Sequence, residues 1–481
     1  MTESVSRGTA YLFLAQFVFL VSGYIVHVGL GRLLGPAEYG VIGIILSLML
    51  LTQTLLMRGL PQALAKEISA HPEQKEALFN TAFWVQLLTA AVVTAAFFFG
   101  ANLIAHFFRD PSLVKYIRLS SAIIIPTALF SLYSDGFLNG THKFRTQAWL
   151  RGLNSILKPI FIFPLVLLGY TISGAVAGYI LTGFTSWFFS WYATGIRITQ
   201  KAFHSSLDLL KKAFPIMMIS FTYVLLNNID LYLLKHLLES NYAAGIFSAA
   251  DNLARTSPQL FFALAFTIMP AISAALAKQE LLLAKKYITE ALRYLLLILL
   301  PITVMVSATA TPLVTLFYSS SFADSGAVLQ ILIFGSMFFA MFTVLNSVAI
   351  GAGDSSKALW SSVLLIAVST ILNLILIPKY GVQGAAIATA ATALLGVLIL
   401  LLYVRIKLKA GFQWGSSLKI IAASLVIYLL ALSIPVSGLW LALEYCLLGI
   451  IYLLLLFVLE EIQEKDYQLI KRIFTKPKAK R

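Results

Sequence analysis

The sequence has almost no cysteine and no cluster of metal-binding residues. Its one cysteine, Cys446, has no intrachain disulfide partner, and the six histidines are scattered, so no spacing indicates a zinc or redox site. It also lacks a Gly-rich phosphate-binding loop followed by lysine, paired metal-binding acids, and a nucleophile beside a base. These absences argue against direct ATP use, hydrolysis and metal catalysis, and we expect no cofactor and no enzymatic activity.

Charged residues are also scarce, at 11% of 481, whereas 59% are hydrophobic and the mean hydropathy is +0.89. Such a chain cannot surround a soluble core with polar residues, which predicts an integral membrane protein. The net charge of +15 does not indicate nucleic-acid binding, because the basic residues lie between apolar runs. The first apolar run, 10–30, lacks a small-residue cleavage pattern and is expected to be a retained span.

Apolar runs of about 20 residues, enough to cross ~30 Å of hydrocarbon, recur along the chain. They predict an all-α membrane protein of about fourteen transmembrane helices. The approximate centres of the runs are Leu20, Leu48, Ala90, Ile125, Ile160, Leu181, Val224, Leu260, Leu299, Phe338, Ile366, Ala393, Val426 and Leu448. With a cytoplasmic amino terminus, 27 of the 35 Lys and Arg residues fall inside. This bias predicts a multi-pass protein of the cytoplasmic (inner) membrane with both termini in the cytoplasm.

The chain resembles itself at an offset of about 210 residues. Tyr170 and Gly174 match Tyr380 and Gly384, and further matches pair 138–140 with 349–351, 38–41 with 241–245, and 61–66 with 270–278. An internal repeat of this kind predicts two pseudo-symmetric six-helix lobes, with a substrate path where they meet. Chance similarity of Gly- and Ala-rich helices is the alternative.

The repeat sets the predicted domain boundaries. We expect a first lobe at 1–199, a linker at 200–212, a second lobe at 213–409, two additional helices at 410–460 and a basic cytoplasmic tail at 461–481. In the linker region, Phe203, Leu207, Leu210 and Phe214 recur at helical spacing beside lysines. This pattern predicts an amphipathic helix on the cytoplasmic membrane face, with a short solvated connector as the alternative.

Three motifs resemble a known family: GRLLGPAEYG at 31–40, GAGD at 351–354 and YGVQGAA at 380–386. They look like the polysaccharide transporter branch of the multidrug/oligosaccharidyl-lipid/polysaccharide (MOP) exporter superfamily. The resemblance covers most of the chain. It implies a flippase that moves a lipid-linked oligosaccharide, on polyprenyl phosphate or pyrophosphate, to the outer leaflet by alternating access, for cell-surface polysaccharide or glycoprotein biosynthesis. The expected partners are that lipid and membrane lipids, without nucleic acid, and the chain is expected to act as a monomer.

An anionic headgroup crossing hydrocarbon needs cations, so ionisable residues within spans are the candidate substrate-binding residues. Lys158 lies in the fifth span beside Pro159 and Pro164; it is either a cavity cation or paired with a neighbouring helix. Arg255 lies in the eighth span. It either recognises phosphate or sugar, or is neutralised by Asp251 one turn earlier.

Five more residues are candidate contacts for the substrate. Arg58 and Arg151 lie on the cytoplasmic side and either meet the entering phosphate or snorkel to the interface, and Arg32 at the outer side has the same two interpretations. Gln53 and Asn154 either contact sugar hydroxyls or bond other helices.

Asp230 in the seventh span is the main candidate for ion coupling, together with Asp251. By resemblance to lipid II flippases, a sodium site would combine Asp230 with Asn373 and either Thr389 or Thr392. The second acid of that site is replaced here by Ile377. Coupling to Na⁺, coupling to H⁺, no coupling and a structural role for Asp230 therefore stay open.

Two other functions also stay open. A multidrug/cation antiporter of the same superfamily would favour acids in its cavity, and Asp135, Asp230 and Asp251 keep that alternative open. A membrane polymerase or ligase acting on lipid-linked sugars would usually have a large outer domain or loop, whereas the predicted outer loops are all short.

Overall fold

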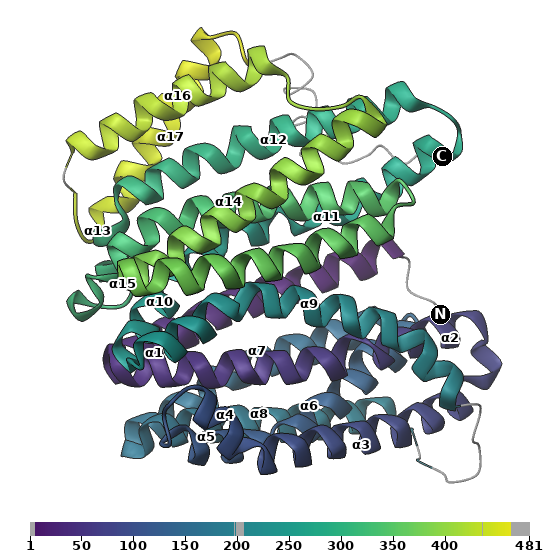
Figure 1. The fold of residues 1–481 in the computed structure, drawn as a ribbon. Coiled ribbons are helices and arrows are strands. Elements are labelled where there is room, and N and C mark those ends of the chain that lie inside the picture. The colour runs from purple at the N-terminus through teal and green to yellow at the C-terminus, as the bar shows by residue number, and fades with distance from the viewer. Residues whose placement is uncertain (1–4, 197, 199–205, 435, 463–481) are drawn as a thin grey trace. The chain divides into compact units, whose positions relative to one another are not determined.

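The computed structural model describes residues 5–196, 198, 206–434 and 436–462, and every element in this part of the chain is helical (Figure 1). The first elements are α1 (Val5–Arg58), α2 (Leu60–Ala70), η1 (Pro72–Gln74), α3 (Lys75–Phe99), α4 (Ala101–Phe107), α5 (Leu113–Ser121), α6 (Ile124–Ser131), η2 (Leu132–Leu138), α7 (Phe144–Leu165), η3 (Val166–Tyr170) and α8 (Thr171–Thr194). The others are α9 (Ser206–Leu238), α10 (Asn241–Ala254), α11 (Thr256–Ala277), α12 (Leu281–Ala308), α13 (Ala310–Phe317), η4 (Ser320–Phe322), α14 (Ser325–Gly351), α15 (Ser355–Leu408), α16 (Trp414–Ser433) and α17 (Trp440–Val458).

The hydropathy pattern is matched by helices of membrane-spanning length. Nine helical segments of the described chain are long and apolar enough to cross a membrane. Three of them, at 11–70, 144–194 and 355–408, contain two predicted spans each. The predicted spans centred on Val224 and Leu260 fall on α9 and α11. The prediction of an all-α membrane protein of about fourteen spans is therefore confirmed.

The three double-length segments turn at glycines with non-helical backbone: Gly35, Gly169 and Gly381. Pro36 follows the first of them and has no backbone N–H to continue the helical ladder. These turns leave almost no loop between the two consecutive spans that each of them joins.

Contacts divide the chain into two compact units. Unit 1 comprises residues up to Ala249 together with Ile366–Ala385, and unit 2 comprises Ala250–Leu365 and the residues from Ala386 onward. This division follows packing, whereas the predicted lobe boundaries at 199, 212, 409 and 460 follow the sequence repeat, so those boundaries stay a prediction. One consequence is that α9, the first helix of the predicted second lobe, packs in unit 1.

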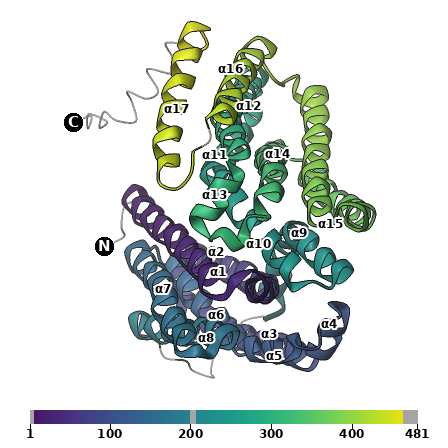
Figure 2. The same ribbon diagram turned by 90° about the vertical axis from the view of Figure 1, so that its left-hand side faces the viewer.

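Unit 1 is built on long helices that pack side by side. Helix α1 packs along α7, and α7 packs against α8 (Figure 1), while α3 lies next to α5 (Figure 2). Aromatic rings fill the core where α3 meets η2. The Phe79 ring centre lies 4.8 Å from that of Tyr133 and 5.5 Å from that of Phe137, close enough for favourable edge contacts.

The start of α9 also packs into this core. Leu209 and Ala213 are buried in it, and Lys212 forms an ion pair with Glu67 of α2 at 2.8 Å. Residues 206–212 of the predicted linker are thus the first turns of the helix that carries the seventh span, and residues 200–205 lie outside the described part of the chain.

In unit 2, α14 packs against α11 and α12, and α16 lies beside α12 and α17 (Figure 1). Polar contacts fasten the two additional helices. The Tyr452 hydroxyl donates to the Leu297 carbonyl at 2.8 Å, and Arg293 pairs with Glu461 at 2.7 Å with both side chains buried. Glu461 begins the predicted tail, whose residues 463–481 lie outside the described part.

Asp354 ends the GAGD motif and closes the α15 hairpin. Its carboxylate accepts hydrogen bonds from Tyr403 at 2.6 Å and Lys407 at 2.7 Å. The hydrogen bonds from Lys407 and Tyr403 lower the pKa of Asp354 to about 2, so the carboxylate is charged at neutral pH.

The repeat has a structural counterpart in each unit. A Cβ on Gly140 would lie 2.9 Å from the Ala65 carbonyl oxygen, and one on Gly351 would lie 2.6 Å from that of Met269. Both glycines end the motifs at 138–140 and 349–351, and both permit a close helix approach that a side chain would prevent. In these two contacts Ala65 corresponds to Met269. This correspondence differs from the sequence match of 61–66 with 270–278, so the structural repeat is shifted here relative to the sequence repeat.

Candidate functional site

Lys158 is a partly exposed cation in the membrane-spanning helix α7. Its ammonium lies over the Phe19 ring of α1, 4.9 Å from the ring centre, so an aromatic face contacts the charge. Among the described residues, no carboxylate forms an ion pair with it. Pro159 and Pro164 lie in the same helix, and each removes one backbone hydrogen bond there. The ammonium is therefore available for an anion.

Arg151, by contrast, is paired. The Asp135 carboxylate in η2 accepts hydrogen bonds from Arg151 at 2.6 and 3.0 Å. Ser131 at 3.1 Å and Gln147 at 3.3 Å donate to the same carboxylate. Because Asp135 compensates the guanidinium, Arg151 contributes no net charge to this part of unit 1. The pairing was not predicted, since the two residues lie on different turns of different helices.

Arg255 and Asp251 form the predicted one-turn pair in unit 2, with Nε of Arg255 2.7 Å from the Asp251 carboxylate. Arg255 stands between α10 and α11, and its backbone N–H still donates to the Asp251 carbonyl oxygen at 3.0 Å. The side chains are 31% and 23% exposed. Neutralisation of Arg255 by Asp251 was one of the two interpretations of the sequence. The other, recognition of phosphate by Arg255, stays a prediction.

The other predicted contacts are spread over several helices. Asn154 donates a hydrogen bond to Ser186 of α8 at 2.9 Å, so it bonds a neighbouring helix, which was one of its two predicted roles. Gln53 is half-buried in α1, and Arg58 is exposed in its last turn. Arg32 is exposed next to the break at residue 35. No hydrogen bond or ion pair in the described part of the chain joins Gln53 or Arg58 to Lys158.

Asp230 and Asn373 are brought together in the interior of unit 1. The Asp230 carboxylate accepts hydrogen bonds from Asn373 Nδ2 at 2.5 Å and Ser369 Oγ at 2.9 Å, and all three residues are buried. The Asn373 Oδ1 atom has no hydrogen-bond partner among the described residues. Sequence reasoning missed Ser369, which its position one turn before Asn373 could have revealed. Thr389 belongs to unit 2.

A histidine within a span was also missed. His27 Nδ1 lies 3.1 Å from the Tyr39 hydroxyl, on the other side of the α1 break. Tyr39 is 1% exposed, so this is a polar contact inside the helical core of unit 1. An ionisable residue inside an apolar run was the available signal.

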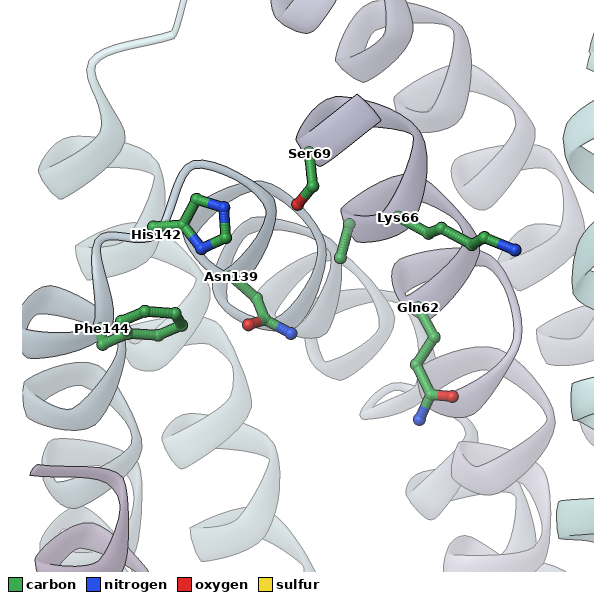
Figure 3. A pocket seen from close by; sticks show the side chains of 7 residues that line it. Gln62, Lys66, Ser69, Asn139, His142 and Phe144 are labelled. Carbon is green, nitrogen blue, oxygen red and sulfur yellow. The ribbon is translucent and has the colours of Figure 1, made fainter. Parts of the chain in front are cut away.

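A cavity of about 290 Å³ opens in unit 1 beside the Gly140 contact. Figure 3 shows α2 on one side of it and the turn before α7 on the other. It is lined by Gln62, Ala65, Lys66, Ser69, Asn139, His142 and Phe144. None of these was predicted as a site residue, and the predicted topology places them at the cytoplasmic end of the spans.

Both the sequence and the fold are similar to those of known proteins. Residues 30–327 match the model of a family described as polysaccharide biosynthesis protein. The lipid II flippase MurJ of Bacillus subtilis (strain 168) is 23% identical over 474 residues, covering 86% of this chain and 84% of the relative.

Two solved structures share the fold. The lipid II flippase MurJ in an inward closed conformation superposes with a TM-score of 0.80 at 17% identity, covering 96% of this chain and 99% of that one. An inward-facing multidrug resistance MATE family transporter of the MOP superfamily superposes with a TM-score of 0.67 at 16% identity, covering 80% and 94%.

The class is therefore an all-helical, multi-pass membrane protein with the fold of the MOP superfamily and ionisable groups inside its spans. The chain belongs to the polysaccharide biosynthesis protein family, whose model matches more than half of it.

Proposed function

We propose that this protein carries a lipid-linked oligosaccharide, on polyprenyl phosphate or pyrophosphate, from the cytoplasmic to the outer leaflet of the cell membrane. Membership of a polysaccharide biosynthesis family supports this substrate class, as does a flippase among the relatives. Two six-helix lobes rocking about the substrate would admit the glycan on one side and release it on the other, while the lipid tail stays in the bilayer. The protein would act as a monomer.

Lys158 is the observation that carries the proposal. A charged side chain within a span is costly unless a counter-charge or water accompanies it. No described carboxylate supplies that counter-charge. Phosphate oxygens would accept charge-assisted hydrogen bonds from the ammonium, and Arg58 and Gln53 on α1 would contact the headgroup as it enters.

The pairing of two of the three acids weakens the antiporter alternative, while Asp230 accepts hydrogen bonds from Asn373 and Ser369. Asp135 and Asp251 are each held by an arginine, at 2.6 and 2.7 Å. A carboxylate that is already neutralised in this way is a poor ligand for a cationic drug, because the positive charge of the arginine repels the drug. An anionic substrate fits this charge pattern better.

A role as a polymerase or ligase has less support. The named relatives are a flippase and a transporter, and the turns at residues 35, 169 and 381 leave little chain outside the helices for a catalytic domain. We therefore assign movement of the lipid rather than chemistry on its sugar.

Native mass spectrometry of the protein in gentle detergent tests the substrate class. We expect a co-purified polyprenyl phosphate or pyrophosphate glycan, resolved from ordinary phospholipids in the same spectrum. Absence of such a lipid, with small organic cations bound in competition with protons, would favour the antiporter instead.

We place any coupling to Na⁺ or H⁺ at Asp230, with Asn373 as a further oxygen ligand. Asp230→Asn keeps the shape but removes the negative charge and the proton site. We expect gradient-driven flipping in reconstituted vesicles to slow by about tenfold or more, with lipid retention unchanged. Thr222→Val on the same helix is the control. A full response to both gradients in the Asp230 variant would remove this residue from coupling.

A further inference from the structure

A charged contact joins the loop between α4 and α5 to the end of α9, and all of it lies in unit 1. We call it the outer latch and define it as Arg109, Asp110, Lys235, Glu239 and Asn241. The predicted topology places Arg109 and Lys235 on the outer side of the membrane.

Lys235 is the centre of the latch. Its side chain is 1% exposed, and its ammonium lies 2.8 Å from Asp110 Oδ2 and 2.5 Å from Asn241 Oδ1. Burial alone would raise the pKa of Asp110, but hydrogen bonds from Lys235 and Ser112 lower it below its usual 3.8. The Asp110 carboxylate is therefore charged at neutral pH.

The rim of the latch adds two more contacts between the same elements. Arg109 and Glu239 form an ion pair at 2.6 Å with both side chains about half exposed. His236 lies flat on Phe107, with ring centres 4.8 Å apart, and its Nδ1 is 2.5 Å from the Phe107 carbonyl oxygen. Water reaches this rim but not Lys235.

A close helix crossing lies beside the latch. A Cβ on Gly40 would lie 1.9 Å from the Asn241 carbonyl oxygen, and a Cβ on Gly245 would lie 1.8 Å from that of Pro36. The two contacts are reciprocal. The last residue of 36–40 meets the first residue of 241–245, and the last residue of 241–245 meets the first residue of 36–40. This reciprocal geometry is that of a local two-fold crossing, and it leaves no room for any side chain at either glycine.

Apart from the Lys235–Asn241 hydrogen bond, these contacts join the predicted first lobe, 1–199, to the predicted second lobe, 213–409. Alternating access requires the two lobes to part at their outer ends before a substrate can leave. We propose that the outer latch is the gate that holds the outer side closed, and that Lys235 and Asp110 must separate for release. This inference rests on the proposed function.

Charge suits such a gate physically. A buried ion pair gains attraction at the cost of hydration, so the closed state holds little net advantage over an open state in which water solvates both groups. An apolar contact of the same size would favour closure only, because opening would expose it to water. A paired ammonium and carboxylate can therefore be stable in either state.

Thiol labelling tests the gate without relying on transport. In a Cys446→Ser background, Leu231→Cys places a reporter one turn below Lys235, at a position 6% exposed. A membrane-impermeant methanethiosulfonate is added to intact cells and, separately, to inverted membrane vesicles. We expect Lys235→Met to raise labelling from outside by about tenfold, as the open fraction rises. The exposed outer lysine variant Lys115→Met is the control and should leave the rate unchanged.

Two further variants keep the test decisive if Lys235→Met folds poorly. The exchange Asp110→Lys with Lys235→Asp restores an ion pair and should return labelling to the parent rate. Gly40→Ala leaves every charge in place but wedges the crossing apart, so it should raise labelling, whereas Gly23→Ala, with open space around it, should not.

The gate is overturned if neither Lys235→Met nor Gly40→Ala labels faster than its control. It is also overturned if faster labelling is confined to inverted vesicles, or if the charge exchange labels as fast as Lys235→Met. Faster labelling from outside in a protein that retains no glycan lipid would support the gate while rejecting the proposed substrate.

Discussion

Replacing Lys158 by methionine is expected to strip the glycan lipid from the purified protein and to stop its export. Methionine keeps the unbranched length of the side chain and its contact with Phe19, so only the charge is lost. A hydrogen bond to a charged group contributes about 1.5–3 kcal/mol, which corresponds to roughly tenfold to a hundredfold weaker binding. Native mass spectrometry measures the retained lipid, and surface polysaccharide measures export.

Lys285→Met is the matched control, because it removes one lysine charge from an exposed position on α12. It should retain the lipid and export normally. Arg255→Ala is expected to reduce export too, but it also leaves Asp251 without its partner at 2.7 Å, so its effect is less specific. Normal export and normal lipid retention by the Lys158 variant would reject the cationic cavity.

Replacing Arg293 by methionine is expected to cause the largest loss of stability. The guanidinium is 1% exposed, and Nε lies 2.7 Å from the Glu461 carboxylate, while Nη2 donates to the Glu461 carbonyl oxygen at 2.7 Å. Removing one partner of a buried ion pair costs about 3–5 kcal/mol, because a buried charge stays uncompensated. Thermal unfolding in detergent measures the loss, and hydrogen exchange should show α16 and α17 opening first.

The double variant Arg293→Met with Glu461→Leu removes both charges and should recover most of the stability, since well-packed apolar residues can replace a buried pair. Arg405→Met, at an exposed position of α15, should have little effect. If the single and double variants unfold at the same temperature, the ion pair is not what fastens the two additional helices.

Hydropathy predicted the spans well because each span is a local property. About twenty apolar residues must form a helix in a bilayer whatever surrounds them, and all fourteen predicted centres fall on helices. The glycine turns at residues 169 and 381 could also be predicted from the sequence, because both lie within matching motifs of the repeat. The family resemblance rested on these same local motifs.

The polar contacts of the interior were mostly not predictable. Arg255 and Asp251 stand one turn apart, so helical spacing alone predicted their pairing. Lys235 and Asp110 are 125 residues apart, and Arg293 and Glu461 are 168 apart. The predicted topology places Lys235 on the outer side, but nothing in the sequence indicates that the fold buries it beside Asp110 or that Asp135 pairs with Arg151.

The sequence by itself determined that this protein lies in a membrane, how often it crosses, and which family it belongs to, because hydrophobic length and turn glycines act within a few residues. Only the tertiary structure decided which charges are compensated. Arg151, Lys235 and Arg293 each pair with an acid from another element, whereas no described carboxylate pairs with Lys158. The reason is that helices close in space can be far apart in the chain, and burial makes each charge depend on whichever partner packing brings to it.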